Sequence, residues 1–251
     1  MTFQKEPMLL SPAKVIFEDN HLLVVDKPSG VASAHGKGPE DSLDHLLRDW
    51  LKERDKKPGN VFLGVVQRID RPVTGVLLFA KTSKAASRLA EQFRDGLAKK
   101  TYWAIVEPGP TESEGIMEDF LGVGPGEFGG RKAWITNADD PEGKHSLTKF
   151  SVRKRLGRRA WLELNPKTGR THQLRVQLGS RGYPILGDDR YGAKKRLPWG
   201  IALHARSLTV EHPVSGKWET YTAQVPQDWP DELGKGWNFP VPQSQSPRRP
   251  F

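Results

Sequence analysis

The chain has 251 residues, 36% of them apolar, and a formal net charge of +9, and this length suffices for one large domain or two small ones with a buried core. Cysteine is absent, which excludes disulfides, thiolate zinc sites, iron–sulfur clusters and a cysteine nucleophile. There is neither a run of eighteen apolar residues nor a hydrophobic signal region at the N-terminus, so we expect a cytoplasmic protein without a membrane span.

In chain order, the first half of the sequence predicts a leader and then strands with two helices. Residues 1–11 are expected to be a flexible leader. Runs of β-branched and apolar residues predict strands, and apolar positions three and four apart predict helices. The strands are expected at Val15–Phe17, Leu22–Asp26, Val61–Val66, Val76–Ala80 and Lys99–Val106, and the helices at Ser42–Glu53 and from the N-cap Ser83 to a stop at Gly96.

The second half predicts further strands and one more helix. Residues 107–145 are rich in Gly, Pro and charge and predict loops with short strands, with 122–130 as a flexible hairpin tip. The remaining strands are expected at Phe150–Val152, Ala160–Leu164, Ile201–Val210 and Trp218–Val225, and the helix from Gly169 or Arg170 to Gly182. The composition then changes to Pro, Gln, Ser and Arg, which predicts a disordered tail over 228–251.

Many strands, few helices and no regular βαβ alternation predict an α+β domain over 12–227 with a mixed, largely antiparallel sheet. The excess of Lys and Arg favours a polyanionic partner, because each neutralised phosphate releases counterions. The arginines recur beside glycines and turns rather than in one block, as expected if a folded groove collects them. Charge alone does not separate nucleic-acid binding from a merely basic surface.

Several common catalytic signatures are missing from the sequence. There is no Gly-x-x-x-x-Gly-Lys-Ser/Thr phosphate loop and no Gly-x-Ser-x-Gly elbow. The seven histidines lack metal-ligand spacing, so no metal site is expected. The pair Asp188-Asp189 lies between glycines and predicts a turn in which the Asp side chains bond local backbone amides.

The segment from Gln67 to Leu77 holds one acid, Asp70, between Arg68 and Arg71, with apolar runs on either side. Such an acid is either an ionised nucleophile or a residue that stabilises its own turn. The local sequence favours the turn, because Asp is common in turns. Segments elsewhere in the chain have to decide between these two roles of Asp70.

Two further segments have side chains suited to chemistry. Tyr102 is either a core aromatic or a side chain that stacks on a base and moves a proton. If Gly169–Leu178 is helical, Arg175 lies between apolar neighbours, which favours a buried ion pair over a solvated charge. The start of that helix, with Arg170 and the backbone amides that follow, suits a phosphate.

These segments, in this order, resemble the RluA family of RNA pseudouridine synthases. The family pattern His-Arg-Leu-Asp-x-x-Thr-Ser-Gly is matched by residues 67–75, Gln-Arg-Ile-Asp-Arg-Pro-Val-Thr-Gly. The other matches are Asp26-Lys27-Pro28-Ser29-Gly30, Lys100-Thr101-Tyr102-Trp103-Ala104-Ile105-Val106, Gly169-Arg170-Thr171-His172-Gln173-Leu174-Arg175-Val176, Gly182-Tyr183-Pro184-Ile185-Leu186-Gly187-Asp188 with Tyr191-Gly192, and Leu203-His204-Ala205. Together they span roughly residues 14–226.

The resemblance implies a pseudouridine synthase fold with an active-site cleft across the sheet, and the isomerisation of uridines in structured RNA (tRNA or rRNA) without cofactor or metal. It implies that Asp70 breaks the uridine C1′–N1 bond and rejoins C1′ to C5, that Tyr102 stacks on the base, and that Arg175 pairs with the aspartate. Arg68 would fill the space left by the flipped uridine, because a stacked base hides its glycosidic carbon. The implied RNA-binding residues are Arg68, Arg71, Arg170, Thr171, His172 and Gln173.

The sequence departs from the family pattern at Gln67, at Val73-Thr74 and at Gln177, where the family has or commonly has His, Thr-Ser and His. We expect a monomer without an N-terminal S4 domain. Two alternatives stay open. One is an inactive RNA-binding module of the same fold, although binding alone does not need the acid. The other is a glycosidase, which needs a second carboxylate about 5–10 Å from Asp70.

Overall fold

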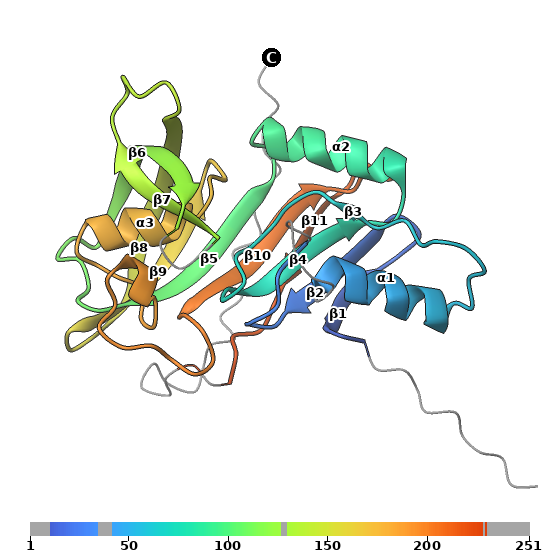
Figure 1. Ribbon diagram of the computed structural model, residues 1–251, viewed down its shortest axis with the longest axis horizontal. Helices are drawn as coiled ribbons and strands as arrows, with labels where there is room; N and C mark the ends of the chain where they lie inside the picture. The colour runs from blue at the N-terminus through green and yellow to red at the C-terminus, as the bar shows by residue number, and fades with distance from the viewer. Residues whose placement is uncertain (1–10, 35–41, 127–129, 228, 230–251) are drawn as a thin grey trace, which may run out of the picture.

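The computed structural model describes residues 11–34, 42–126, 130–227 and 229. The predicted leader and tail lie outside these residues, apart from Ser11 and Trp229. The described chain forms one eleven-stranded sheet with helices packed on it (Figure 1). None of the helices in these ranges has the length and hydropathy needed to cross a membrane.

The elements follow one another in the order expected for an α+β chain. The strands are β1 (Lys14–Glu18), β2 (Leu22–Lys27), β3 (Gly64–Val65), β4 (Thr74–Ala80), β5 (Lys99–Val106), β6 (Glu114–Pro125), β7 (Arg131–Thr136), β8 (Lys144–Leu156), β9 (Arg159–Pro166), β10 (Leu203–Glu211) and β11 (Trp218–Thr222). The helices are α1 (Leu43–Arg54), α2 (Ser83–Arg94), α3 (Gln173–Ser180) and the 3-10 turn η1 (Asp189–Tyr191).

The predicted mixed, largely antiparallel sheet is confirmed. Its order is β1-β2-β4-β10-β5-β9-β8-β6-β7, with β3 paired to β4 and β11 to β10. The strands pair antiparallel except for β4 and β10, which are parallel. Ala205 of β10 pairs with Gly75 of β4 on one side and with Tyr102 of β5 on the other. The loop that leads into β4 therefore ends roughly 10 Å from Tyr102, because two inter-strand spacings separate β4 from β5.

Different helices cover the two faces of the sheet. Successive residues of a strand point to opposite faces, so neighbouring residues of one strand belong to different cores. Leu23 and Val25 of β2 and Leu77 and Phe79 of β4 belong to the main core, which also contains the buried leucines of α1 and α3. Their neighbours in sequence form a second core with α2. In Figure 1, α3 and α1 lie towards opposite ends of the sheet.

The prediction of loops with short strands over 107–145 agrees with the loops at 107–113 and 137–143 and with the six-residue β7, but it was wrong for β6. Instead, β6 has twelve residues and pairs with both β7 and β8. Its glycines are packing positions rather than breaks: a Cβ at Gly122 would lie 2.5 Å from Trp134 Nε1, so the indole occupies the place of the missing side chain. The strands remain paired as far as Pro125 and Arg131, so residues 122–125 of the predicted hairpin tip belong to β6, and residues 127–129 of it lie outside the described residues.

Three element boundaries also differ from the prediction. Thr82, not Ser83, caps α2 by accepting a hydrogen bond from the Ala85 amide (3.2 Å). The apolar run Val61–Val66 yields only the two-residue β3. The last helix begins at Gln173, later than expected, because His172 before it has a left-handed backbone conformation (φ 52°) that no right-handed helix accommodates.

Candidate active site

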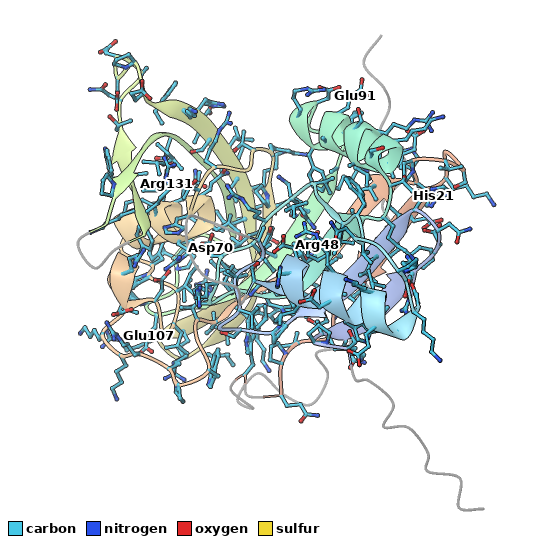
Figure 2. All side chains as sticks on the ribbon, turned by 45° about the vertical axis from the view of Figure 1, so that its right-hand side comes forward. His21, Arg48, Asp70, Glu91, Glu107 and Arg131 are labelled. Atoms are coloured by element: carbon cyan, nitrogen blue, oxygen red, sulfur yellow. The ribbon has the colours of Figure 1, made fainter. Side chains whose placement is uncertain are left out.

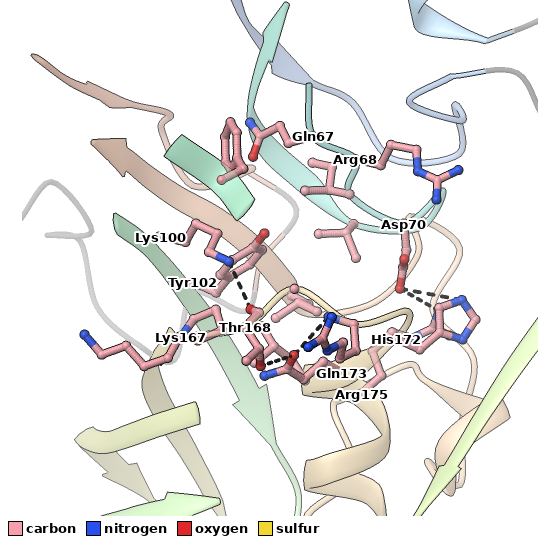
Figure 3. A pocket seen from close by; sticks show the side chains of 18 of the residues that line it. Gln67, Arg68, Asp70, Lys100, Tyr102, Lys167, Thr168, His172, Gln173 and Arg175 are labelled. Atoms are coloured by element: carbon pink, nitrogen blue, oxygen red, sulfur yellow. Dashed lines mark hydrogen bonds and ion pairs between the residues drawn. The ribbon is translucent and has the colours of Figure 1, made fainter. Parts of the chain in front are cut away.

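A cleft of about 410 Å³ opens where the loop before β4 faces β5 and the turn before α3. Asp70, Tyr102, His172 and Arg175 all line it (Figure 3). Three segments far apart in the sequence therefore meet at one site. Asp70 is the only carboxylate among the residues that line this cleft, and Asp188, which lines an adjoining cleft together with Asp70, is bound to Arg175 rather than free to act as the second acid of a glycosidase.

The loop that carries Asp70 is fixed on both sides of this residue. Before it, the Ser33 hydroxyl donates to the Ile69 carbonyl (2.6 Å) and accepts from the Ile69 amide (3.1 Å). After it, the Lys27 ammonium donates to the Arg71 carbonyl (3.1 Å). Asp70 itself retains a side-chain exposure of 27%. The carboxylate is thus presented to the cleft on a backbone with little freedom.

Lys27 is fully buried and binds three backbone carbonyls. Besides that of Arg71, its Nζ donates to the carbonyls of Pro28 (2.8 Å) and Val31 (2.7 Å). These bonds use its three donors. Burial lowers the pKa of Lys27 to about 7. The motif Asp26–Gly30 thus clamps the Asp70 loop, a role that the sequence analysis did not find although the motif itself was recognised.

The Asp70 carboxylate pairs with Arg175 in the first turns of α3. Arg175 Nη1 donates to Asp70 Oδ2 (3.1 Å), and the Arg175 side chain is only 6% exposed. The sequence-based expectation of a buried ion pair is met. The same guanidinium also makes a two-pronged contact, with Nε and Nη2 donating to the Asp188 carboxylate (2.7 and 2.8 Å).

The predicted role of the Asp188 side chain was wrong. Asp188 was predicted to bond local backbone amides in a turn, but its side chain is 1% exposed and its carboxylate binds Arg175. Burial opposes the charge of the guanidinium, but the hydrogen bond with Asp188 and the charges of both carboxylates raise the pKa of Arg175. Thirteen residues separate the two partners, so no local pattern reveals the pair.

Tyr102 stands on β5, half-buried at the cleft. Burial, together with the negative charge of Asp70, raises the pKa of the Tyr102 phenol. The hydroxyl is therefore protonated at neutral pH. A neutral aromatic ring beside a carboxylate suits an uncharged base.

Basic side chains surround the cleft. Arg68 is exposed at its edge, and Lys100 Nζ donates to the Thr168 carbonyl (2.9 Å). Burial and the neighbouring charges of Arg170 and Lys167 lower the pKa of Lys100 to about 8. Arg170 is also exposed, and its Nε donates to the His145 carbonyl (3.0 Å).

A second cleft, of about 520 Å³, shares Asp70, His172 and Arg175 with the first. Its additional arginines are Arg71, Arg131, Arg190 and Arg196. In Figure 2, Arg131 lies to the left of Asp70, towards β6 and β7, and both line this cleft. Arg71, predicted to bind RNA, lines this second cleft rather than the first.

The other predicted RNA-binding residues differ in accessibility. Gln173 is buried, and its amide makes four hydrogen bonds, to Thr168, the Arg170 amide, the Leu147 carbonyl and Thr148. Its amide therefore holds the turn before α3. Thr171 is half-buried and belongs to neither lining set. His172 is 12% exposed and lies with Nε2 3.8 Å from Asp70 Oδ2.

The departures from the family pattern fall in different places. Gln177 is buried away from the cleft, where it binds Thr148, the Met117 carbonyl and Asp119. Gln67 lines the cleft, and its buried Nε2 has no hydrogen-bond partner among the described residues. The change at Gln67 therefore concerns the site, whereas that at Gln177 concerns the packing of α3.

The model of a family described as RNA pseudouridylate synthase matches residues 21–180. The chain is 33% identical over 220 residues to an uncharacterized RNA pseudouridine synthase of Synechocystis sp., covering 86% of this chain and 66% of that protein. It is 32% identical over 228 residues to the ribosomal large subunit pseudouridine synthase D of Zymomonas mobilis, covering 86% and 70%. The chain thus spans about two thirds of these relatives.

The fold is similar to that of the human RNA Pseudouridylate Synthase Domain Containing 4. The TM-score is 0.70 at 24% identity, with 85% of this chain and 89% of the human chain covered. Human RNA Pseudouridylate Synthase Domain Containing 1 gives 0.69 at 24% identity, covering 91% and 89%. These structures agree with the α+β architecture expected from the sequence.

Proposed function

Since this chain belongs to the RNA pseudouridylate synthase family, we propose that it isomerises uridine to pseudouridine in RNA with Asp70 as the catalytic carboxylate. The observation that carries the proposal is the Asp70–Arg175 pair. It lies in a cleft that Tyr102 and several Lys and Arg side chains also line. An acid that stabilised only its own turn would need no buried arginine from a distant helix.

The proposed reaction needs no co-reactant. The C1′–N1 bond breaks, the base turns within the cleft and C1′ bonds to C5; C5 loses a proton and N1 gains one. Asp70 supplies the carboxylate that attacks C1′ or balances its developing positive charge. Arg175 orients that carboxylate through Oδ2. Tyr102, protonated and aromatic, stacks on the uracil and donates a hydrogen bond.

The uridine has to leave the base stack to reach Asp70, because its glycosidic carbon is covered in a stacked strand. Arg68 is exposed at the edge of the cleft and would fill the gap that the base leaves. The RNA strand would continue on both sides of the flipped nucleotide, along the basic rim of the first cleft and through the arginines of the second.

We propose large-subunit ribosomal RNA as the target class. The support is that several curated relatives of similar identity are named ribosomal large subunit pseudouridine synthases C or D. Action on tRNA, a monomeric state and a cytoplasmic location stay predictions.

The test is Asp70→Asn, assayed by mapping pseudouridine in ribosomal RNA and by RNA binding. We expect pseudouridine formation to be abolished while binding largely persists, because the amide keeps the shape of the carboxylate. Asp55→Asn is the matched control: Asp55 pairs with Arg54 (2.7 Å), its side chain is 28% exposed against 27% for Asp70, and neither residue lines either cleft. Undiminished activity of the Asp70 variant would contradict the proposal. If the wild-type protein bound RNA but formed no pseudouridine, the inactive RNA-binding module would be favoured.

A further inference from the structure

His172 has a backbone conformation that is uncommon for a residue other than glycine. Its φ of 52° and ψ of 21° place it in the left-handed region, where Cβ crowds the carbonyl and which, after Gly, mainly Asn, Asp and His adopt. Such a conformation persists where the surroundings fix it, often at functional sites. Here it directs the imidazole inward, between Tyr191 and Asp70.

The hydrogen bonds of Tyr191 specify the proton position on His172. Within the described chain, the Tyr191 hydroxyl accepts from the Ala133 amide (3.0 Å) and contacts His172 Nδ1 (2.7 Å). Since Ala133 can only donate, the phenolic proton has one described acceptor, His172 Nδ1. A neutral imidazole that accepts at Nδ1 has its hydrogen on Nε2.

The His172 ring is surrounded by charges of both signs. Asp70 and Asp188 favour a positive ring, whereas Arg175 and Arg190 oppose it. Burial is the largest influence and lowers the pKa of His172 below its usual value of 6.5. The ring is therefore neutral at pH 7, as the Tyr191 hydrogen bond requires.

We propose that Tyr191 fixes His172 as the Nε2–H tautomer, so that its N–H faces Oδ2 of Asp70 beside the hydrogen bond from Arg175 Nη1 and leaves Oδ1 to face C1′ of the nucleotide. The proposal rests on the proposed function. The hydrogen bond from Arg175 (3.1 Å) and the longer approach of His172 Nε2 (3.8 Å, beyond hydrogen-bond distance) both fall on Oδ2. His172 and Tyr191 are thus positioning residues rather than RNA contacts.

The first test is the tautomer of His172, read from the ring ¹³C and ¹⁵N chemical shifts of the full chain at pH 7.5 without RNA. We expect the Nε2–H form in the wild type and a mixture of both tautomers in Tyr191→Phe. Tyr183→Phe is the control, since Tyr183 is half-buried just beyond α3 and lines neither cleft. An Nδ1–H tautomer in the wild type, or unchanged shifts in Tyr191→Phe, would overturn the proposal.

The second test is kinetic and uses His172→Asn, because Asn tolerates the left-handed backbone. We expect kcat on a large-subunit ribosomal RNA transcript to fall about 10-fold, the lower end of the effect of a hydrogen bond to a charged group because the 3.8 Å approach is longer than such a bond, with unchanged KM. His145→Asn, at an exposed histidine bonded to Glu118, should leave both constants unchanged. A raised KM at constant kcat would instead assign His172 to RNA binding. If the wild type forms no pseudouridine, the proposed function fails, while the tautomer measurement still decides the positioning claim.

Discussion

Arg175 lies between two carboxylates, and the two contacts are unequal. Asp188 receives two hydrogen bonds at 2.7 and 2.8 Å, whereas Asp70 receives one at 3.1 Å. A bidentate contact fixes the plane of a guanidinium, and the remaining N–H is then directed by geometry rather than by attraction alone. Asp188 therefore sets the orientation of Arg175, and Arg175 sets that of Asp70.

Asp188→Asn tests this chain of orientation. We expect the free energy of unfolding to fall by about 3 kcal/mol, because one partner of a buried ion pair is lost. The kcat of pseudouridine formation should fall as well, since Arg175 is then free to rotate. Urea denaturation and steady-state kinetics measure the two effects.

Asp189→Asn is the matched control for Asp188→Asn. Asp189 pairs with Arg196, whose side chain is 81% exposed, so its loss should change the free energy of unfolding by less than about 1 kcal/mol. Equal losses of stability in the two variants would contradict the special role of Asp188.

Only part of this site could be predicted from residue patterns. Arg175 was found because an arginine between apolar residues of a helix needs a buried partner. Asp188 was assigned to a turn because Gly187 precedes it and Tyr191-Gly192 follows, whereas its partner lies in another element. The local sequence shows that a charged side chain lies among apolar residues and needs a partner. It does not show which residue of another element is that partner, because the fold brings the two together.

At the level of elements, the parallel pairing of β4 with β10 underlies the site. A Cβ at Gly75 would lie 2.3 Å from the Ala205 carbonyl oxygen, and the Gly75 φ is +110°, so only glycine fits there. Beside it, the Thr74 hydroxyl bonds His204 Nδ1 (2.8 Å). The polar contact and the close approach together hold the end of the Asp70 loop against β10.

Protonation of His204 at acidic pH should therefore lower the stability of this strand pairing. His204 is completely buried, and burial lowers its pKa from 6.5 to about 4. Between these values the unfolded state binds a proton that the folded state does not, so the free energy of unfolding falls as the pH drops from 6.5 to 4. The loss from this group is about 3 kcal/mol at the lower end.

His204→Gln separates this effect from that of the other titrating groups. Denaturation curves between pH 7 and pH 4 should show a smaller decline of stability for the variant than for the wild type. The remaining carboxylates and histidines contribute to both curves and cancel in the difference. Parallel declines would show that His204 does not titrate in this range.

The elements themselves were predicted unevenly. Strands with continuous apolar or β-branched residues, such as β2, β4 and β5, coincide closely with their predicted ranges. β6 was missed because Gly122 and Gly124 resemble loop residues until Trp134 of the neighbouring strand is seen to pack against them. The apolar residues of β6, among them Met117 and Leu121, are interrupted by glycines and acids, so no regular alternation marks the strand.

At the scale of the whole molecule, the sheet brings two basic clefts together at Asp70. The first is lined by residues of β5, the Asp70 loop and the turn before α3, and the second also by residues of β7 and η1. The net charge of +9 is thus partly concentrated along one path. A single nucleotide would need only the first cleft, whereas a strand that continues past the flipped uridine would also pass Arg131 and Arg190.

The salt dependence of RNA binding tests this path. Binding of a large-subunit ribosomal RNA transcript should weaken steeply with salt, because phosphate contacts release counterions. Arg131→Gln with Arg190→Gln, made in the Asp70→Asn background so that no product forms, should reduce the slope of log Kd against log salt. The expected reduction is about 1.4 to 1.8, or 0.7 to 0.9 for each lost phosphate contact.

A matched pair of lysines distinguishes contact from general charge. Lys84 on α2 and Lys217 before β11 are exposed and line neither cleft, so Lys84→Gln with Lys217→Gln removes the same two charges elsewhere. Charges that touch no phosphate release no counterions, and this pair should leave the slope nearly unchanged. Equal reductions in both double variants would mean that RNA responds to net charge, and the strand would then not have to pass through the second cleft.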